Sequence, residues 1–307
     1  MKNVVITGPT GAIGIALINE LIKNNIRVTA ICHKRSKRIA NIPVSELVTI
    51  VECDIEDIKD CIESLPHDYD VFFHFAWACT FGDSRNNIDA QIKNIKYTID
   101  AVETAYKLGC KRFIGAGSQA EYGRYEGKLN SSVPTFPENG YGIAKLCAGQ
   151  LSKIRCEQLG LEHVWTRILS VYGPYDGPNT MVNGLIKSIK NGESPNCTLG
   201  EQIWDFIYSK DIALAFRLIA EKGINGKIYC IGSGVGRPLK EYINIIRDMI
   251  NSEIEIGFGK ISYGEKQVMY LCADIKELVS DTGFKPRYSF EKGIRETIEW
   301  FDEQRGK

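Results

Sequence analysis

Hydrophobic positions in the first two thirds of the chain fall into short apolar runs that alternate with amphipathic stretches. In the first such stretch, Ile13, Ala16, Leu17 and Leu21 recur at helical spacing and share one face. Short runs that are apolar throughout are typical of parallel strands covered on both faces. We therefore expect an α/β fold with a doubly wound parallel sheet. The pattern predicts strands over 4–7, 28–32, 48–52, 71–75, 113–116 and 163–168, and helices over 12–23, 89–108 and 141–158.

The last third of the chain has a different pattern, with Gly and Pro frequent around 172–178 and 232–238. It predicts helices over 211–220, 239–250 and 290–301, joined by longer irregular segments. We expect a smaller, mainly helical C-terminal lobe that lies on the carboxyl edge of the sheet. The expected sheet domain comprises 1–172 and a return segment at about 205–231. Residues 173–204 and 232–307 then form the lobe.

Bulk composition narrows the class of protein. The 307 residues hold 38 Lys plus Arg against 38 Asp plus Glu, so charge gives no case for a nucleic acid or membrane partner. Ten cysteines are scattered without CxxC pairs, which predicts reduced thiols. Four histidines without clustering at ligand spacing predict no metal site. There is no signal-peptide pattern and no apolar run of about 18 residues, so we expect a cytoplasmic protein.

The first predicted strand ends in a glycine-rich turn, TGPTGAIG, at 7–14. Gly8 permits a tight turn, Gly11 allows the backbone to approach a pyrophosphate, and Gly14 allows the helix to pack on the strand. The pyrophosphate would lie at the helix N-terminus, where unpaired N–H groups favour negative charge. Such a turn can be merely structural, but its place between a strand and a helix predicts a dinucleotide site. The expected contacts are Gly8, Thr10, Gly11, Ala12 and Ile13.

The segment after the second strand, HKRSKR at 33–38, bears on the choice between NAD and NADP. NAD sites normally use an acidic residue there for the ribose 2′-hydroxyl, and here no carboxylate is available. Cations lie instead where a 2′-phosphate would bind, and the planar fork of Arg35 suits phosphate best. We expect His33, Lys34 and Arg35 to contact the cofactor, and NADP(H) to be favoured over NAD(H). A solvated basic loop is the alternative.

Tyr141 and Lys145 lie four residues apart at the start of a predicted helix, so their side chains share one face. Tyrosine has a pKa near ~10, and a neighbouring ammonium favours the phenolate and lowers that pKa. Taken alone, such a pair is more often structural than catalytic. Ser118 follows the strand at 113–116, at the carboxyl end where open α/β sheets bind ligands. Its hydroxyl could hold a carbonyl oxygen while Tyr141 delivers or removes a proton.

The glycine turn, SQAEYG at 118–123, the YxxxK pair and RILSVYGP at 167–174 together resemble the extended short-chain dehydrogenase/reductase family. That family has a Rossmann-type fold and includes NAD(P)-dependent nucleotide-sugar epimerases and dehydratases. The resemblance implies a catalytic triad of Ser118, Tyr141 and Lys145, with Lys145 also bonding the nicotinamide ribose. It implies a homodimer paired through the helices at 89–108 and 141–158. It also places Asp54 and Ile55 at the adenine, Phe75, Ala76 and Trp77 over the nicotinamide ribose, and Asn94 in support of the site.

Gln119 and Ala120 bear on the reaction. Dehydratases of this family carry Asp and Glu at these positions to eliminate water, so dehydration is not expected. Epimerases and ketoreductases share the triad, but an epimerase retains its cofactor whereas a reductase exchanges it. The basic segment favours an NADPH-dependent ketoreductase of a nucleotide-linked keto sugar, and an NAD-dependent nucleotide-sugar epimerase is the alternative. A non-catalytic dinucleotide-sensing module is a more distant alternative, because it would be expected to lose the triad.

The arginines that family members use for a substrate diphosphate are missing. Trp204 takes the position of one of them, the segment SYGE at 262–265 lacks another, and Ser170 replaces a usual asparagine. Arg237, Lys260 or Lys266 could compensate, although each is more often a plain surface charge. Trp204 could instead stack on a base or line a pocket for a smaller carbonyl compound. The expected substrate contacts are Thr80, Gln119, Ser170, Trp204 and Arg237.

Three further features have open alternatives. The segment at 77–87 follows a strand end, so it covers the substrate or is a loop without a ligand role. Glu121 lies near the triad in the sequence and either touches substrate hydroxyls or is structural. His74 lies in the apolar run FFHF at 72–75 and is expected to be a core histidine.

Overall fold

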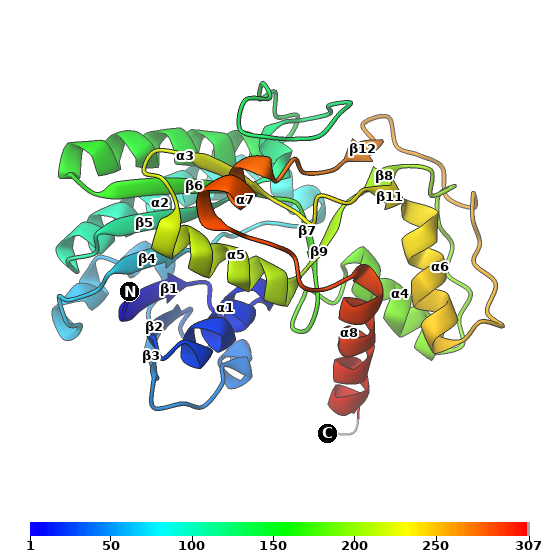
Figure 1. The fold of residues 1–307 in the computed structure, drawn as a ribbon, viewed down its shortest axis with the longest axis horizontal. Coiled ribbons are helices and arrows are strands. Elements are labelled where there is room, and N and C mark those ends of the chain that lie inside the picture. Colours follow the sequence, from blue (N-terminus) through cyan, green and yellow to red (C-terminus); the bar gives the residue numbers. More distant parts are fainter. Residues whose placement is uncertain (306–307) are drawn as a thin grey trace.

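The computed structural model describes residues 1–305, apart from the side chains of 63, 64 and 305. Its centre is a seven-stranded sheet with the order β10-β6-β5-β4-β1-β2-β3 (Figure 1). Every pair of neighbours in this sheet is parallel. The expected doubly wound α/β fold is confirmed. The strands are β1 (Asn3–Thr7), β2 (Arg27–Cys32), β3 (Val48–Glu52), β4 (Val71–His74), β5 (Arg112–Ser118), β6 (Glu162–Ile168) and β10 (Ile228–Ile231).

Helices cover both faces of the sheet because successive side chains of each strand point to opposite faces. Val4 and Ile6 of β1 belong to a core cluster shared with α1 (Ala12–Lys23) and α5 (Ser209–Lys222). Val5, between them, belongs to a second cluster shared with α2 and α3. Helix α2 spans Ile88–Lys107 and α3 spans Gly140–Leu159, and the two lie side by side over the sheet (Figure 1).

The segment after β6 leaves the sheet and returns to it. Strand β7 (Ser170–Tyr172) pairs in parallel with β9 (Phe206–Tyr208), and α5 then leads to β10 at the edge beside β6. Most elements between and after these segments form a separate layer that lies at the right in Figure 1, whereas α7 (Lys276–Thr282) packs on α5 and β10. The division into a dinucleotide domain and a substrate lobe at the stated boundaries stays a prediction.

An aromatic core holds that layer together. Tyr172, Phe206, Tyr242 and Phe290 are buried in one cluster, and the Tyr242 and Phe290 ring centroids lie 4.5 Å apart. Three short strands, β11-β8-β12, form a small sheet beside this core. The elements of this layer are α4 (Met181–Lys190), β8 (Ile203–Trp204), β11 (Arg237–Pro238), α6 (Leu239–Ile250), β12 (Tyr270–Leu271) and α8 (Phe290–Arg305).

Short 3-10 helices form the rim above the carboxyl ends of the strands. Two of them matter for the site, namely η1 (Lys37–Asn41) after β2 and η4 (Gly82–Asn86) after β4. A third, η5 (Gln119–Glu121), follows β5 directly. Within residues 1–305, the ten cysteines form no disulfide. Among residues 1–305, no helix has both the length and the apolar character that crossing a membrane requires. The remaining short helices are η2 (Ile55–Asp57) and η3 (Asp60–Ser64).

Candidate active site

A cleft of about 520 Å³ lies above the carboxyl ends of β1, β4 and β5. The glycine turn forms its floor. Gly8 has a φ of +68°, and a Cβ built on it would lie 2.8 Å from the backbone nitrogen of Ala76. A Cβ on Gly14 would lie 2.6 Å from the backbone of Pro9. Gly11 is the N-cap of α1 and supplies no side-chain cap, so the first amides of the helix are open to an anion. This glycine-only cradle fits the pyrophosphate of a dinucleotide.

The catalytic residues predicted from the sequence meet at one wall of this cleft. Ser118 ends β5, Tyr141 is in the first turn of α3, and Lys145 lies one turn further along. The Ser118 side chain lies close enough to that of Tyr141 to lower the pKa of the tyrosine. The Lys145 Nζ donates to the Ala116 carbonyl oxygen at 2.5 Å and lies 3.7 Å from the centre of the Trp77 ring. It lies 5.8 Å from the centre of the Tyr141 ring. The arrangement places two hydroxyls and an amine beside one point in the cleft.

Burial shifts the pKa of both titratable members of the triad. Burial lowers the pKa of the Lys145 amine to about 7, against a smaller opposing effect of the Glu121 carboxylate. Burial also raises the pKa of Tyr141 above its ordinary value of 10.0. The Ser118 hydroxyl and the charge of Arg85 lower the pKa of Tyr141, whereas Glu121 raises it. A buried tyrosine and an amine that titrates near neutrality can exchange a proton with a bound carbonyl compound.

Glu121 supports the triad from behind. One carboxylate oxygen accepts the backbone N–H of Ser118 at 2.8 Å and the Trp165 indole N–H at 3.0 Å. The other accepts the Arg167 Nε at 2.8 Å, and both side chains of this ion pair are buried. Both carboxylate oxygens are therefore engaged inside the protein. Glu121 is also not among the described residues that line the cleft. Of the two readings of Glu121 that the sequence leaves open, the structure supports the structural one.

His74 is buried at the end of β4, and Asn94 holds the backbone that follows this strand. The Thr7 hydroxyl lies 2.9 Å from Nδ1 of His74, and burial lowers the pKa of this histidine to about 3, so it is neutral. The Asn94 side chain accepts from the Ala78 N–H and donates to the Ala78 carbonyl, each at 3.0 Å. Asn94 therefore acts on the cleft through the segment it holds, and it does not line the cleft itself.

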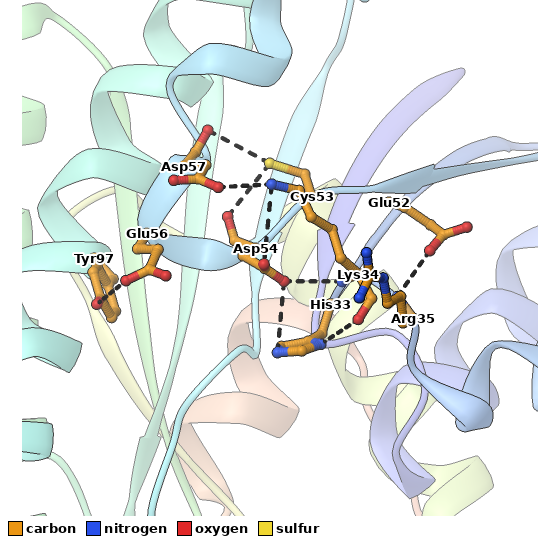
Figure 2. A network of polar contacts seen from close by, with 9 residues as sticks. All are labelled: His33, Lys34, Arg35, Glu52, Cys53, Asp54, Glu56, Asp57 and Tyr97. Carbon is orange, nitrogen blue, oxygen red and sulfur yellow. Dashed lines mark hydrogen bonds and ion pairs between the residues drawn. The ribbon is translucent and has the colours of Figure 1, made fainter.

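The basic segment after β2 has carboxylate neighbours that its own sequence does not show (Figure 2). Strands β2 and β3 pair in register, with Cys32 opposite Glu52, so the residues after β3 lie beside those after β2. Glu52 accepts the backbone N–H of Arg35 at 2.9 Å. Asp54 accepts that of Lys34 at 2.9 Å, and Asp57 forms an ion pair with the Lys34 ammonium at 2.8 Å. The prediction that no carboxylate is available at the end of β2 is wrong. It considered only the residues that follow β2, whereas these carboxylates come from the end of β3 and the segment after it.

Arg38 is the member of this segment that lines the cleft. Its guanidinium would lie 3.9 Å from a Cβ on Gly11, and it donates to the Tyr175 carbonyl oxygen at 3.0 Å. Neither His33, Lys34 nor Arg35 is among the described residues that line the cleft. Sequence reasoning counted Arg38 as one of several cations but missed its position. The available signal was Ser36, which caps the turn that carries Arg38 back toward the glycine turn.

The segment at 77–87 covers the cleft and is attached to α3. The Asn86 side chain accepts the Gly140 backbone N–H at 2.9 Å, at the N-terminus of α3. Phe81 and Arg85 from this segment line the cleft, and the Arg85 guanidinium carbon lies 4.6 Å from the centre of the Tyr141 ring. The alternative that the segment covers the site is therefore supported. Sequence reasoning did not select Arg85.

The substrate contacts expected from the sequence are only partly brought together. Trp204 lies behind Ser170, to which its indole N–H donates at 2.8 Å. Arg237 forms an ion pair with Glu291 at 2.7 Å and does not line the cleft. Of all the expected site residues, the cleft contains Gly8, Thr10, Gly11, Ala12, Ile13, Phe75, Ala76, Trp77, Thr80, Ser118, Gln119, Tyr141, Lys145 and Ser170. It does not contain His33, Lys34, Arg35, Asp54, Ile55, Asn94, Trp204 or Arg237.

The doubly wound sheet, the glycine cradle and the Ser–Tyr–Lys wall define a dinucleotide-binding α/β enzyme. Residues 4–232 match the model of the NAD dependent epimerase/dehydratase family, and the chain belongs to this family of extended short-chain dehydrogenases/reductases.

Known relatives cover nearly the whole chain. CDP-abequose synthase from Salmonella muenchen is 29% identical over 97% of both chains. The dTDP-4-dehydro-6-deoxyglucose reductase of Escherichia coli is 26% identical over 97% of this chain and 96% of its own. The structure of UDP-N-acetylglucosamine 4-epimerase from Methanobrevibacter ruminantium M1, in complex with UDP-N-acetylmuramic acid, is 30% identical with a TM-score of 0.89 over 99% of both chains.

Proposed function

We propose that the protein is an NADPH-dependent ketoreductase of a nucleotide-linked keto sugar. The observation that carries the proposal is the cleft wall in which Ser118, Tyr141 and Lys145 meet while Gln119 and Ala120 occupy the next two positions. These residues suit proton transfer at a carbonyl and offer no acid or base for elimination of water. The E. coli relative, by its name a reductase of a dTDP-linked dehydro sugar, supports the same reaction.

The chain's own residues account for the proton side of the reaction. When bound, a reduced nicotinamide dinucleotide supplies the hydride for the carbonyl carbon. Ser118 would hold the carbonyl oxygen, and Tyr141 would give it a proton, so that the O–H bond of the tyrosine breaks as that of the product alcohol forms. Lys145 lies one turn away on α3 and favours the resulting phenolate to the extent that it is protonated. The glycine turn and Arg38 would hold the dinucleotide.

The preference for NADP(H) over NAD(H) is part of this proposal. In the described part of the chain, no ion pair joins a carboxylate to the side chain of Arg35, Lys37 or Arg38, although the charge of Arg38 lowers the pKa of Asp176, which also lines the cleft. They stay available for a phosphate. The carboxylates of Glu52, Asp54 and Asp57 weaken the case, because they reduce the positive potential at the end of β2. Calorimetric titration with NADPH and with NADH tests the preference, and equal affinity for the two would contradict it.

A nucleotide-sugar 4-epimerase is the second candidate, favoured by the 30% identity and full coverage of the epimerase structure. An epimerase returns its hydride to the same substrate, so it needs no net oxidant and retains its dinucleotide. The purified protein should therefore be analysed for bound dinucleotide and then mixed with NADPH and dTDP-4-dehydro-6-deoxyglucose. Net oxidation of NADPH with formation of the alcohol is expected. Retained NAD with interconversion of UDP-sugars and no net oxidation would favour the epimerase.

We also infer that a second copy of the chain packs on α2 and α3. These adjacent helices expose large apolar side chains, including Ile92 at 59%, Ile143 at 55%, Leu151 at 43% and Ile154 at 51%. Large exposed apolar side chains gathered on two adjacent helices are typical of protein interfaces. The family resemblance implies pairing through the same two helices, which supports a homodimer.

A further inference from the structure

The segment η4 holds Arg85 against the catalytic tyrosine. The bond from the Gly140 N–H to Asn86 fixes η4 to the N-terminus of α3, one residue before Tyr141. A Cβ built on Gly140 would lie 3.0 Å from the Arg85 carbonyl oxygen, so the two backbones are in contact there. The Ser84 hydroxyl also closes the turn by donating to the Phe81 carbonyl at 2.5 Å. Arg85 is thereby placed with its guanidinium over the Tyr141 ring, at 4.6 Å from the ring centre.

The Arg85 guanidinium has no counter-charge in the described part of the chain. No ion pair joins it to an Asp or Glu carboxylate among the described residues. Its Nε is buried and has no hydrogen-bond partner there. A partly buried cation without an anion is unfavourable unless an anion forms beside it. The group that faces it is Tyr141, whose side chain becomes an anion each time it gives up its proton.

Lys145 is a weaker partner for that anion than its position on α3 suggests. Its Nζ donates to the Ala116 carbonyl and lies closer to the Trp77 ring than to the Tyr141 ring. With a pKa of about 7, the amine is only partly charged at neutral pH. A guanidinium stays charged over the whole working range of pH. The groups that face Tyr141 are Arg85 from η4, Ser118 from β5, Glu121 from η5 and Lys145 from its own helix.

We propose that Arg85 is a further catalytic residue, whose guanidinium stabilises the Tyr141 phenolate from the face of the ring. This role rests on the proposed function, in which the Tyr141 proton passes to the carbonyl oxygen as hydride from NADPH adds to the carbonyl carbon. The interaction grows as charge develops on the ring, so it favours the transition state more than the ground state. The expected contribution is about tenfold or more in the ionisation constant of Tyr141, or one pH unit.

The test titrates Tyr141 directly and needs no substrate. The full chain is labelled with 3-fluorotyrosine, and the ¹⁹F signal of Tyr141 is assigned by its loss in Tyr141→Phe. The pH midpoint of that signal is then compared in the wild type, Arg85→Gln and Arg85→Lys. Arg247→Gln is the matched control, because Arg247 is also partly buried, lies on α6 outside the cleft lining and pairs with Asp248.

The expected midpoint in Arg85→Gln is about one pH unit above that of the wild type. Arg85→Lys is expected to fall between them, and Arg247→Gln to match the wild type. An unchanged midpoint in Arg85→Gln, with melting temperature and NADPH binding preserved, would overturn the role of Arg85. If Arg85→Gln does not fold, a wild-type midpoint in Arg85→Lys alone would do so. If the Arg85 variants shift the Tyr141 midpoint as expected but the wild type shows no reductase activity, the result counts against the proposed function and not against the role of Arg85.

Discussion

Arg38 and Tyr175 join two walls of the cofactor cleft, because the Arg38 guanidinium donates to the Tyr175 carbonyl oxygen at 3.0 Å. Arg38 comes from η1 after β2, and Tyr175 comes from the segment after β7. Both line the cleft, and Tyr175 has a φ of +64°, which is unfavourable for a residue with a Cβ. The contact positions the guanidinium beside Gly11, at the expected place of the cofactor pyrophosphate.

Arg38→Gln is expected to lower the affinity for NADPH and for NADH alike, by between about tenfold and a hundredfold. The substitution removes a charged hydrogen bond to the pyrophosphate that both dinucleotides contain. Arg35→Gln is expected to lower the affinity for NADPH alone, because Arg35 would contact only the 2′-phosphate, which NADH lacks. Calorimetric titrations of both variants with both dinucleotides check the two roles, with Arg247→Gln as the control. Loss of NADPH affinity alone in Arg38→Gln would assign the 2′-phosphate to Arg38 instead.

Tyr141→Phe is expected to abolish turnover, by at least about a thousandfold, because it removes the proton that the carbonyl oxygen needs. Its ring packing against Trp77 is retained, so NADPH affinity should stay within about threefold of the wild type. Stopped-flow absorbance of NADPH measures turnover, and fluorescence titration measures binding. Loss of binding together with turnover would show that this tyrosine is structural.

Lys145 makes stability rise with pH, in the same direction as a carboxylate whose pKa is lowered on folding, but in a window that begins near neutrality. Its pKa is about 7 in the folded chain against 10.5 in a free lysine, so between these values the unfolded chain binds the extra proton. Stability contributed by this group therefore rises with pH, by about 1.4 kcal/mol per pH unit across that window. Below pH 7 the buried charge lowers the stability of the fold in full.

Urea unfolding of the wild type and Lys145→Met at several pH values checks this effect. The wild type is expected to be the less stable of the two near pH 6, and the difference should shrink as pH rises toward 10. Other groups that titrate in this range are common to both chains and cancel in the difference. Parallel stability curves would show that Lys145 keeps an ordinary pKa.

The sequence predicts those parts of the fold and site that neighbouring residues determine. The glycine turn and the Tyr141–Lys145 pair are local patterns, each read from fewer than about ten consecutive residues. Helix α6 was also predicted at its observed bounds, because its apolar positions repeat at helical spacing. Ser118 was found because a parallel strand delivers the residue after it to the ligand edge.

Arg38, Arg85 and Glu52 could not be placed in the same way. Glu52 reaches the backbone of Arg35 through the register of β2 and β3, which a run of letters does not specify. Arg85 faces Tyr141 only because Asn86 fixes η4 to α3, over 54 residues of separation. The sequence favours Arg35 because a guanidinium suits a phosphate. In the structure the chain turns after Ser36, so that Arg38 lines the cleft.

Glu121→Gln is expected to lower the free energy of unfolding by about 3 kcal/mol, because it leaves the buried Arg167 charge without its anion. Replacing Arg167 by Met in the same chain should recover part of this loss, since neither charge then remains. Glu138→Gln is the control, because Glu138 pairs with Arg124 at the surface and should cost less than about 1 kcal/mol. Urea unfolding measures these four chains and Arg167→Met alone, and additive losses in the double variant would contradict a coupled pair.

Leu151→Glu is expected to convert a dimer to monomers. Leu151 is 43% exposed on α3, among the apolar residues that we assign to the subunit interface. A carboxylate there would be buried without a partner in the dimer, which costs several kcal/mol in each subunit. Ile261→Glu is the matched control, because Ile261 is 50% exposed and lies outside α2 and α3.

Light scattering after size exclusion should give twice 34.4 kDa for the wild type and for Ile261→Glu, and 34.4 kDa for Leu151→Glu. The same chains should be compared by melting temperature, so that loss of the dimer is separated from loss of the fold. A monomeric wild type would remove the dimer proposal. If Leu151→Glu forms a dimer with the wild-type dissociation constant, the subunit interface does not include this part of α3.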